Sequence, residues 1–276
     1  MPSMGPFDPE AVREFERAGW NRAASAYESA FATATRQFIE PLLDAASVGT
    51  GASVLDLCCG PGFVTAAASG RGAHVTGLDF STAMLAEART RFPSIAFDHG
   101  DAEVPPYDDA CFDAVVSNFG IHHVPRPALA IASVHRILRR GGRFAFTIWA
   151  GQWENIAWKL VFDAVRRHGD PQASAAPPPG GGFATEADCL AALAAAGFSQ
   201  TSARLVRGSW RHRDAASLLA ALRAGTARMA AMIDAQSEAA MLAIVADLEV
   251  STRPYRDGWA GLTIPIACVI AEGGKP

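Results

Sequence analysis

The spacing of apolar positions changes along the chain, and this pattern predicts an α/β protein. Residues 9–46 place apolar side chains at near-helical spacing, which predicts two helices with a break near Gly19. Short apolar runs then alternate with amphipathic segments. The predicted strands are residues 53–57, 74–80, 95–99, 112–119 and 143–149, and the predicted helices are 63–69, 82–91 and 126–138. Gly141 and Gly142 are expected to end the last helix. Strands that alternate with helices indicate a parallel sheet covered on both faces.

Beyond residue 149 the alternation lapses, which predicts additions to this core. Residues 153–167 are predicted as a helix, and the proline- and glycine-rich residues 172–182 as a loop. Thr185 is expected to cap a helix that ends at Gly197. The remaining predictions are strands at residues 200–210 and 262–271 and a helical block at 214–250. That block is about twice as long as a simple crossover needs, so it either covers a pocket or packs on the sheet edge.

Composition narrows the possible functions. Half of the 276 residues are apolar and 19% are charged, which indicates a globular protein with a substantial core. A net charge of −4 argues against nucleic acid and anionic membranes as partners. Five cysteines without a C-x-x-C spacing argue against a zinc site and a disulfide framework. With neither a signal-peptide pattern nor a long apolar run, we expect a cytoplasmic protein with no membrane span and no metal.

Four polar features follow successive predicted strands, at the edge where open α/β sheets bind ligands. The first is Asp56, followed by a small-residue turn at residues 58–62. The second is Asp79, an acceptor suited to the two hydroxyl groups of a ribose. The third is Asp101, which could accept from an adenine amino group. The fourth is the segment 117–123, which ends in His122 and His123. Together, in register, they form a strong signal for a nucleotide-like ligand.

The first turn favours an ammonium group over a diphosphate. The dinucleotide fingerprint G-x-G-x-x-G fits poorly: begun at Gly60 it would need glycine where Thr65 stands, and begun at position 58 it would need glycine in place of Cys58. Asp56 would also repel an anionic diphosphate. A ligand with adenosine at one end and an amino acid at the other fits these charges.

These residues resemble the class I S-adenosylmethionine-dependent methyltransferases, within the group called type 11 methyltransferases. The resemblance covers about residues 50–150. Its motifs are Val-Leu-Asp-Leu-Cys-Cys-Gly-Pro-Gly at 54–62, Gly-Leu-Asp-Phe-Ser at 77–81 with Met84-Leu85, Gly-Asp-Ala-Glu at 100–103 with Pro105, Phe-Asp-Ala-Val-Val-Ser at 112–117, His122-His123, and Leu-Arg-Arg-Gly-Gly-Arg at 138–143. The chain departs from the family at Cys58, where glycine or alanine is usual.

The resemblance implies S-adenosylmethionine (SAM) as the cofactor and a Rossmann-like, mostly parallel seven-stranded sheet whose last strand is antiparallel. It implies one domain over residues 1–276, with a helical lid at 9–46, a SAM-binding core at 50–150 and substrate-covering insertions at 151–182 and 211–257. The implied cofactor contacts are Asp56, Cys58, Gly60 and Gly62 at the methionine moiety, Asp79 at the ribose, Phe80, Met84, Asp101 and Ala102 at the adenine, and Asn118 and Phe119 beneath the methyl group.

The insertions predict the kind of acceptor. Their aromatic and methionine residues, among them Trp153 and Met229, favour a small, largely apolar or aromatic molecule, methylated on oxygen, carbon or nitrogen. Trp20 and Tyr27 either pack in the core or form a lid over the ligand.

The role of the histidine pair and the activity both have alternatives. His122 and His123 are candidate general bases for a hydroxyl acceptor, unless one of them only packs or caps its loop. The alternatives to a methyltransferase are a nicotinamide-dependent oxidoreductase, disfavoured by Cys58 and Thr65, and a non-catalytic SAM-binding or interaction protein. The sequence does not identify the acceptor or the oligomeric state.

Overall fold

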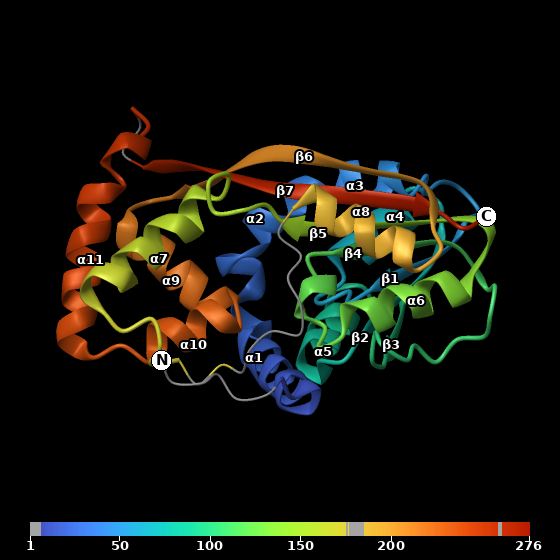
Figure 1. Ribbon diagram of the computed structural model, residues 1–276, viewed down its shortest axis with the longest axis horizontal. Helices are drawn as coiled ribbons and strands as arrows, with labels where there is room; N and C mark the ends of the chain where they lie inside the picture. The colour runs from blue at the N-terminus through green and yellow to red at the C-terminus, as the bar shows by residue number, and fades with distance from the viewer. Residues whose placement is uncertain (1–6, 175, 177–184, 259–260) are drawn as a thin grey trace.

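The computed structural model describes residues 7–174, 176, 185–258 and 261–276, and a seven-stranded sheet forms its centre (Figure 1). The strands are β1 (Ser53–Leu57), β2 (His74–Asp79), β3 (Ala96–His99), β4 (Phe112–Asn118), β5 (Leu138–Trp149), β6 (Ser199–His212) and β7 (Leu262–Gly274). Their order is β3-β2-β1-β4-β5-β7-β6. The pairs among β1 to β5 are parallel, and β7 runs antiparallel to both of its neighbours. The predicted fold class is confirmed.

Helices cover both faces of the sheet because successive strand residues point to opposite sides. Val54 packs in one apolar cluster with the helices α3 (Ile39–Ala45) and α4 (Phe63–Gly70). Its neighbour Leu55 packs in the other cluster, with α6 (Pro127–Ile137) and α8 (Glu186–Ala195). The helix α5 (Thr82–Arg91) packs on β2 and β3. The two-sided cover predicted from the alternation is therefore present.

The remaining helices gather beyond one end of the sheet (Figure 1). They are α7 (Ile156–His168), which follows β5, and α9 (Ala215–Gly225), α10 (Arg228–Asp234) and α11 (Glu238–Ser251), which lie between the long strands β6 and β7. The first helix, α1 (Pro9–Ala30), contacts both α5 and α9. It therefore connects this helical group with the sheet side of the molecule. A short helix α2 (Ala32–Thr35) and the 3₁₀ turn η1 (Arg36–Phe38) link it to α3.

The predicted helix break near Gly19 is wrong. Helix α1 runs through Gly19 without interruption and ends at Ala30, and the backbone N–H of the next residue, Phe31, bonds to the Tyr27 carbonyl. Gly19 is buried, and a Cβ there would lie 2.5 Å from the Cβ of Ala227. The glycine therefore serves a close approach between α1 and the start of α10, and it does not end the helix.

The prediction that Gly141 and Gly142 end a helix is also wrong. Helix α6 ends at Ile137, and Leu138 already has extended backbone angles. The carbonyls of Arg136 and Ile137 accept backbone hydrogen bonds from the segment that leads into β4, which satisfies the helix end without glycine. Gly141 lies instead within β5, at a register irregularity opposite β4, with φ of +78°.

The later segments agree with their predictions where the structure describes them. Thr185 caps α8 through a capping box with Asp188. Residues 175 and 177–182 of the predicted loop lie outside the described residues. Within the described ranges, no single helix is long and apolar enough to cross a membrane. Only α10 and α11 taken together reach that length, and they are bent by 118°.

Candidate functional site

A cavity of about 340 Å³ lies at the carboxyl ends of strands β1 to β4. Helix α1 borders it, and Met229 of α10 together with Trp158 and Phe162 of α7 closes the far end. The cavity brings together all the predicted cofactor residues except Gly62, namely Asp56, Cys58, Gly60, Asp79, Phe80, Met84, Asp101, Ala102, Asn118 and Phe119. The positions that were selected strand by strand in the sequence thus line one continuous space.

Asp56 is a buried carboxylate with one free oxygen. Its Oδ2 accepts a 2.6 Å hydrogen bond from the Thr65 hydroxyl, whereas Oδ1 has no hydrogen-bond partner among the described residues. Burial raises the pKa of Asp56 to about 7; the Thr65 bond lowers it and the Asp79 charge adds to the rise. A buried acceptor without a donor, at the edge of a cavity, fits an ammonium group.

Asp79 fastens the turn that follows β1. Its Oδ2 accepts from the backbone N–H of Gly60 at 2.8 Å, and its Oδ1 accepts from that of Ser81 at 2.8 Å. Burial raises the pKa of Asp79, and these backbone bonds work in the opposite direction. Each oxygen keeps a second lone pair, so the carboxylate can also accept from ribose hydroxyls. Gly60 has φ of +53°, which glycine adopts without strain.

Gly62 does not line the cavity, and the close packing around it requires a glycine. It has φ of +82°, and a Cβ there would lie 2.8 Å from the ring of Phe97. The small size of Gly62 lets helix α4 begin close to β3, and its contact with the cofactor stays a prediction.

Two non-glycine residues at the site have left-handed backbone angles. Cys58 has φ of +60° and Phe119 has φ of +58°. The Phe119 ring stacks on Trp149 with ring centroids 3.9 Å apart, and its backbone N–H bonds to the Thr147 hydroxyl at 2.8 Å. Gly120 packs against the turn at Cys58 so closely that no side chain fits at position 120: a Cβ there would lie 2.3 Å from the Cys58 Cβ. Backbone strain of this kind is common at functional sites.

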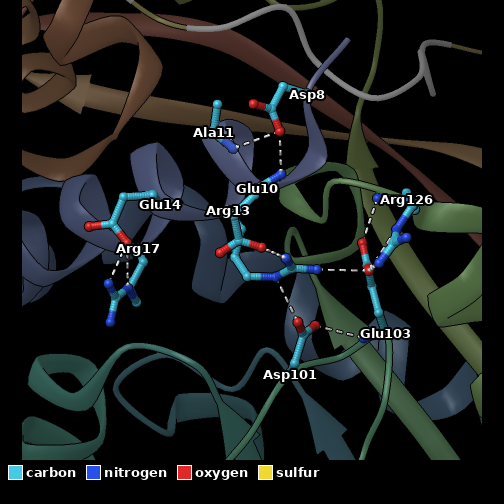
Figure 2. Close-up of polar contacts among 9 residues, drawn as sticks. All are labelled: Asp8, Glu10, Ala11, Arg13, Glu14, Arg17, Asp101, Glu103 and Arg126. Carbon is cyan, nitrogen blue, oxygen red and sulfur yellow. Dashed lines mark hydrogen bonds and ion pairs between the residues drawn. The ribbon is translucent and has the colours of Figure 1, made fainter.

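Asp101 already has a protein partner, which the sequence analysis missed (Figure 2). Nε of Arg13 donates to Asp101 Oδ2 at 2.8 Å, and Nη2 of Arg13 donates to Glu103 at 2.9 Å. Glu103 is buried and also accepts from the backbone N–H and side chain of Arg126, at the start of α6. Arg13 therefore joins α1 to the acid expected beside the adenine.

Helix α1 is held across the ends of three strands. Arg13 reaches the segment after β3. Asn21 accepts a 2.7 Å hydrogen bond from Ser81, which caps α5 after β2. Glu16 contacts His123, in the 3₁₀ turn η2 (Ile121–His123) after β4. These three contacts place α1 directly over the cavity, as a lid would lie.

The two histidines line the cavity in different settings. His122 has its Nδ1 buried without a partner among the described residues, and burial lowers its pKa well below the usual value, with the nearby His123 and Arg228 adding to the effect. His123 has its Nδ1 3.1 Å from Oε2 of Glu16 and its ring edge-on to Trp20 at 4.9 Å. Only His123 thus faces a carboxylate.

The predicted substrate residues separate into two groups. Trp20, Tyr27 and Met229 line the cavity, and the Tyr27 hydroxyl lies 3.3 Å from that of Thr35. Trp153 does not line the cavity. It is 76% exposed, and the Lys159 ammonium group lies over its ring. Phe31 and Trp149, which the sequence pattern did not single out as site residues, join Trp158 in an aromatic wall of edge-on and tilted contacts.

Comparison with known proteins agrees with this geometry. Residues 55–146 match the model of a methyltransferase domain family. A demethylmenaquinone methyltransferase of Beutenbergia cavernae is 41% identical over 101 residues, which are 37% of this chain and 42% of that protein. A malonyl-[acyl-carrier protein] O-methyltransferase of Pseudescherichia vulneris is 38% identical over 147 residues, which are 52% of this chain and 58% of that protein. The chain thus spans about half the length of these curated relatives.

Solved structures share the fold. A phosphoethanolamine N-methyltransferase 2 of Haemonchus contortus, in complex with S-adenosylhomocysteine, superposes with a TM-score of 0.53 at 18% identity, covering 87% of this chain and 52% of that one. A candidate methyltransferase of Bacillus halodurans superposes with a TM-score of 0.58 at 18% identity, covering 87% and 99%. The strand order and the cavity at the strand ends agree with the family match: over residues 55–146 the chain is similar to a methyltransferase domain, and its fold is shared with solved methyltransferase structures.

Proposed function

We propose that this protein transfers the methyl group of SAM to a small, largely apolar or aromatic molecule. The observation that carries the proposal is the free Oδ1 of Asp56, a buried acceptor aligned with the cavity that holds the other predicted cofactor residues. When bound, SAM supplies an electrophilic methyl group on a sulfonium, so the protein has chiefly to hold the acceptor close and in line.

In this proposal, different residues of the core bind different parts of the cofactor. Asp56 takes the ammonium group, with Thr65 holding its second oxygen in place. Asp79 takes the ribose hydroxyls while it fixes the turn at Gly60. Phe80, Met84 and Ala102 pack against the adenine, and Asp101 lies beside its amino group. Residues 50–150 thus form the cofactor half of the site.

The substrate half would come from the helices that do not belong to the alternating core. Residues 9–46 would form a lid, and residues 151–182 and 211–257 would cover the acceptor. Trp149, Trp158 and Phe162 give that part of the cavity an apolar, aromatic wall. Such a wall suits a planar or hydrocarbon acceptor. The relatives named for demethylmenaquinone and for malonyl-[acyl-carrier protein] act on quinone-type and acyl acceptors, and both classes are in range.

The test is S-adenosylhomocysteine release by the whole protein with a panel of phenols, hydroquinones, amines and acyl thioesters. Release with one of these classes, and a matching mass gain of one methyl group in the acceptor, is the expected result. NAD serves as the control ligand, because a nicotinamide oxidoreductase would bind NAD and ignore SAM. Tight NAD binding without SAM binding would reverse the assignment.

We also propose that the protein works in a reducing compartment. The five cysteines are free thiols in the structure. This fits a reducing compartment such as the cytoplasm.

A further inference from the structure

We propose that His123 acts as a general base on a hydroxyl group of the acceptor, and that Glu16 of the lid helix α1 is the positioning residue that orients it. This inference rests on the proposed methyltransferase function and narrows its acceptor to a molecule with a hydroxyl group.

Glu16 lies at the centre of a buried polar cluster. Its side chain is fully buried, although the residue belongs to a helix at the mouth of the cavity. Oε1 accepts a 2.6 Å hydrogen bond from Arg228, and Oε2 accepts a 3.1 Å bond from the indole of Trp20. Nδ1 of His123 lies 3.1 Å from the same Oε2, within hydrogen-bonding distance but short of an aligned hydrogen bond. Distances of this kind often tighten when substrate binds.

Glu16 is ionised in this setting. Burial alone would raise the pKa of Glu16, but the contacts to His123 and Arg228 outweigh it and hold that pKa below its usual value. A carboxylate beside Nδ1 favours the tautomer that carries its proton on Nδ1, which leaves Nε2 as the acceptor. The same charge stabilises the imidazolium that forms when Nε2 takes up a proton.

His122 is the weaker base of the pair. It lines the same cavity, but no carboxylate contacts it among the described residues, and its burial disfavours the charged imidazolium. A histidine that resists protonation removes a proton poorly. The contact to Glu16 therefore distinguishes His123 as the base.

The reaction balances without a further reactant. Nε2 of His123 takes the proton of the acceptor hydroxyl. The oxygen's lone pair forms the new bond to the methyl carbon as the carbon–sulfur bond breaks, and that electron pair stays on sulfur, leaving a neutral thioether. The proton leaves His123 for solvent after the product has gone.

The lid helix makes this base dependent on closure. Glu16 is carried by α1, whereas His123 follows β4 in the core. When α1 moves away, His123 loses the carboxylate that fixes its tautomer. The base is then complete only when α1 covers the cavity, at the moment when water is excluded.

The first test is a spectroscopic one that needs no acceptor. The protein is labelled with 15N-histidine, and long-range proton–nitrogen spectra are recorded at pH 8 without cofactor. The chain has seven histidines, so the His123→Asn variant assigns the signals of His123. The wild type should carry the proton on Nδ1 with Nε2 bare, and Glu16→Gln should shift the population toward Nε2–H. A wild-type proton on Nε2, or an unchanged spectrum in Glu16→Gln, would overturn the proposal.

The second test uses two phenols that differ in acidity. With 4-methylphenol, which keeps its proton at neutral pH, Glu16→Gln should lower kcat about tenfold and leave KM within about twofold. With 4-nitrophenol, which at pH 8 is largely ionised before it binds, the same change should lower kcat by less than about threefold at that pH. The control is Glu14→Gln, an exposed glutamate of the same helix that pairs with Arg17 and should change neither rate. Thermal unfolding of each variant checks that it is folded.

The outcomes separate this inference from the proposed function. Equal losses on both phenols, or methylation of amines with neither phenol accepted, would contradict the base and leave the methyltransferase intact. Absence of SAM binding to the wild type would instead contradict the proposed function itself.

Discussion

The hydroxyl of Thr65 donates a 2.6 Å hydrogen bond to Oδ2 of Asp56, so a residue of helix α4 holds the buried acid at the end of β1. In a dinucleotide fingerprint this position would hold the third glycine, which brings helix and strand together. Here it supplies a donor instead. The bond fixes one oxygen of Asp56 and leaves the other available to the cavity.

Removing that hydroxyl should weaken cofactor binding. Thr65→Val keeps the shape of the side chain but deletes the donor, so Asp56 loses the contact that favours its ionised form. Because a hydrogen bond to a charged group contributes about 1.5 to 3 kcal/mol, SAM affinity at pH 7 should fall at least about tenfold. Calorimetry measures it, and Thr65→Ser is the matched control that restores the hydroxyl. Equal affinity in Thr65→Val and wild type would show that the bond does not prepare Asp56.

The Arg13 contacts predict that the start of α1 loosens when this residue is changed. Arg13→Gln removes the charge that joins α1 to Asp101 and Glu103. Backbone amides of the first turns of α1 should then exchange with solvent about tenfold faster, as expected from losing charge-assisted hydrogen bonds. Hydrogen exchange read by mass spectrometry resolves this segment.

A matched control is available one turn further along. Arg17 is half-exposed and pairs with Glu14 of its own helix, so Arg17→Gln should leave exchange in α1 nearly unchanged. If both variants exchange alike, Arg13 does not hold α1 against the segment after β3.

Gly120 and Cys58 should be energetically coupled. A Cβ at Gly120 would overlap that of Cys58, so Gly120→Ala should lower the free energy of unfolding by about 1 to 3 kcal/mol. Combining it with Cys58→Gly removes the overlapping atoms and should recover part of the loss, giving a coupling of about 1 kcal/mol. Urea unfolding of the four proteins closes the cycle. Gly151→Ala, a position with open space around it, is the neutral control. Strictly additive effects would contradict the predicted contact.

The strands of the sheet could be predicted because their apolar runs are strong and local. Residues 53–57 match β1 throughout, and the other strands differ from their predictions mainly at the ends. The role of Gly19 could not be predicted because glycine both ends helices and permits close packing, and its neighbour Ala227, far away in the sequence, decides which applies. The end of α6 likewise depends on carbonyl partners that come from another segment.

The residues that line the cavity could be predicted because most of them lie at or just past the end of a strand, so sequence order alone brings them to one edge. Arg13, Glu16 and Asn21 were missed because their roles depend on the path of α1 across that edge. One signal was present for Glu16. It stands in the buried stripe of α1 with Val12, Gly19 and Ala23, where a charged residue is out of place unless it has partners.

The raised pKa of Asp56 predicts how stability varies with pH. An acid whose folded pKa lies near 7, above its unfolded value, binds a proton more tightly when folded, so its contribution to stability falls as pH rises from about 4 to 7 and is constant above. Asp56→Asn removes this decrease in stability, because asparagine does not ionise. The variant should therefore be more stable than wild type at pH 8, with a difference that shrinks toward pH 4. Urea unfolding across this range gives the difference curve, and a constant difference would contradict the raised pKa.

The most direct measurement of the central claim is calorimetry of SAM binding to the wild type and to Asp56→Asn between pH 6 and pH 7.5. If Asp56 receives the ammonium group, wild-type affinity should rise roughly eightfold over this interval as the carboxylate ionises. Asp56→Asn should bind more weakly at pH 7.5 and show almost no pH dependence. Equal affinities, or the same pH profile in both proteins, would contradict the account.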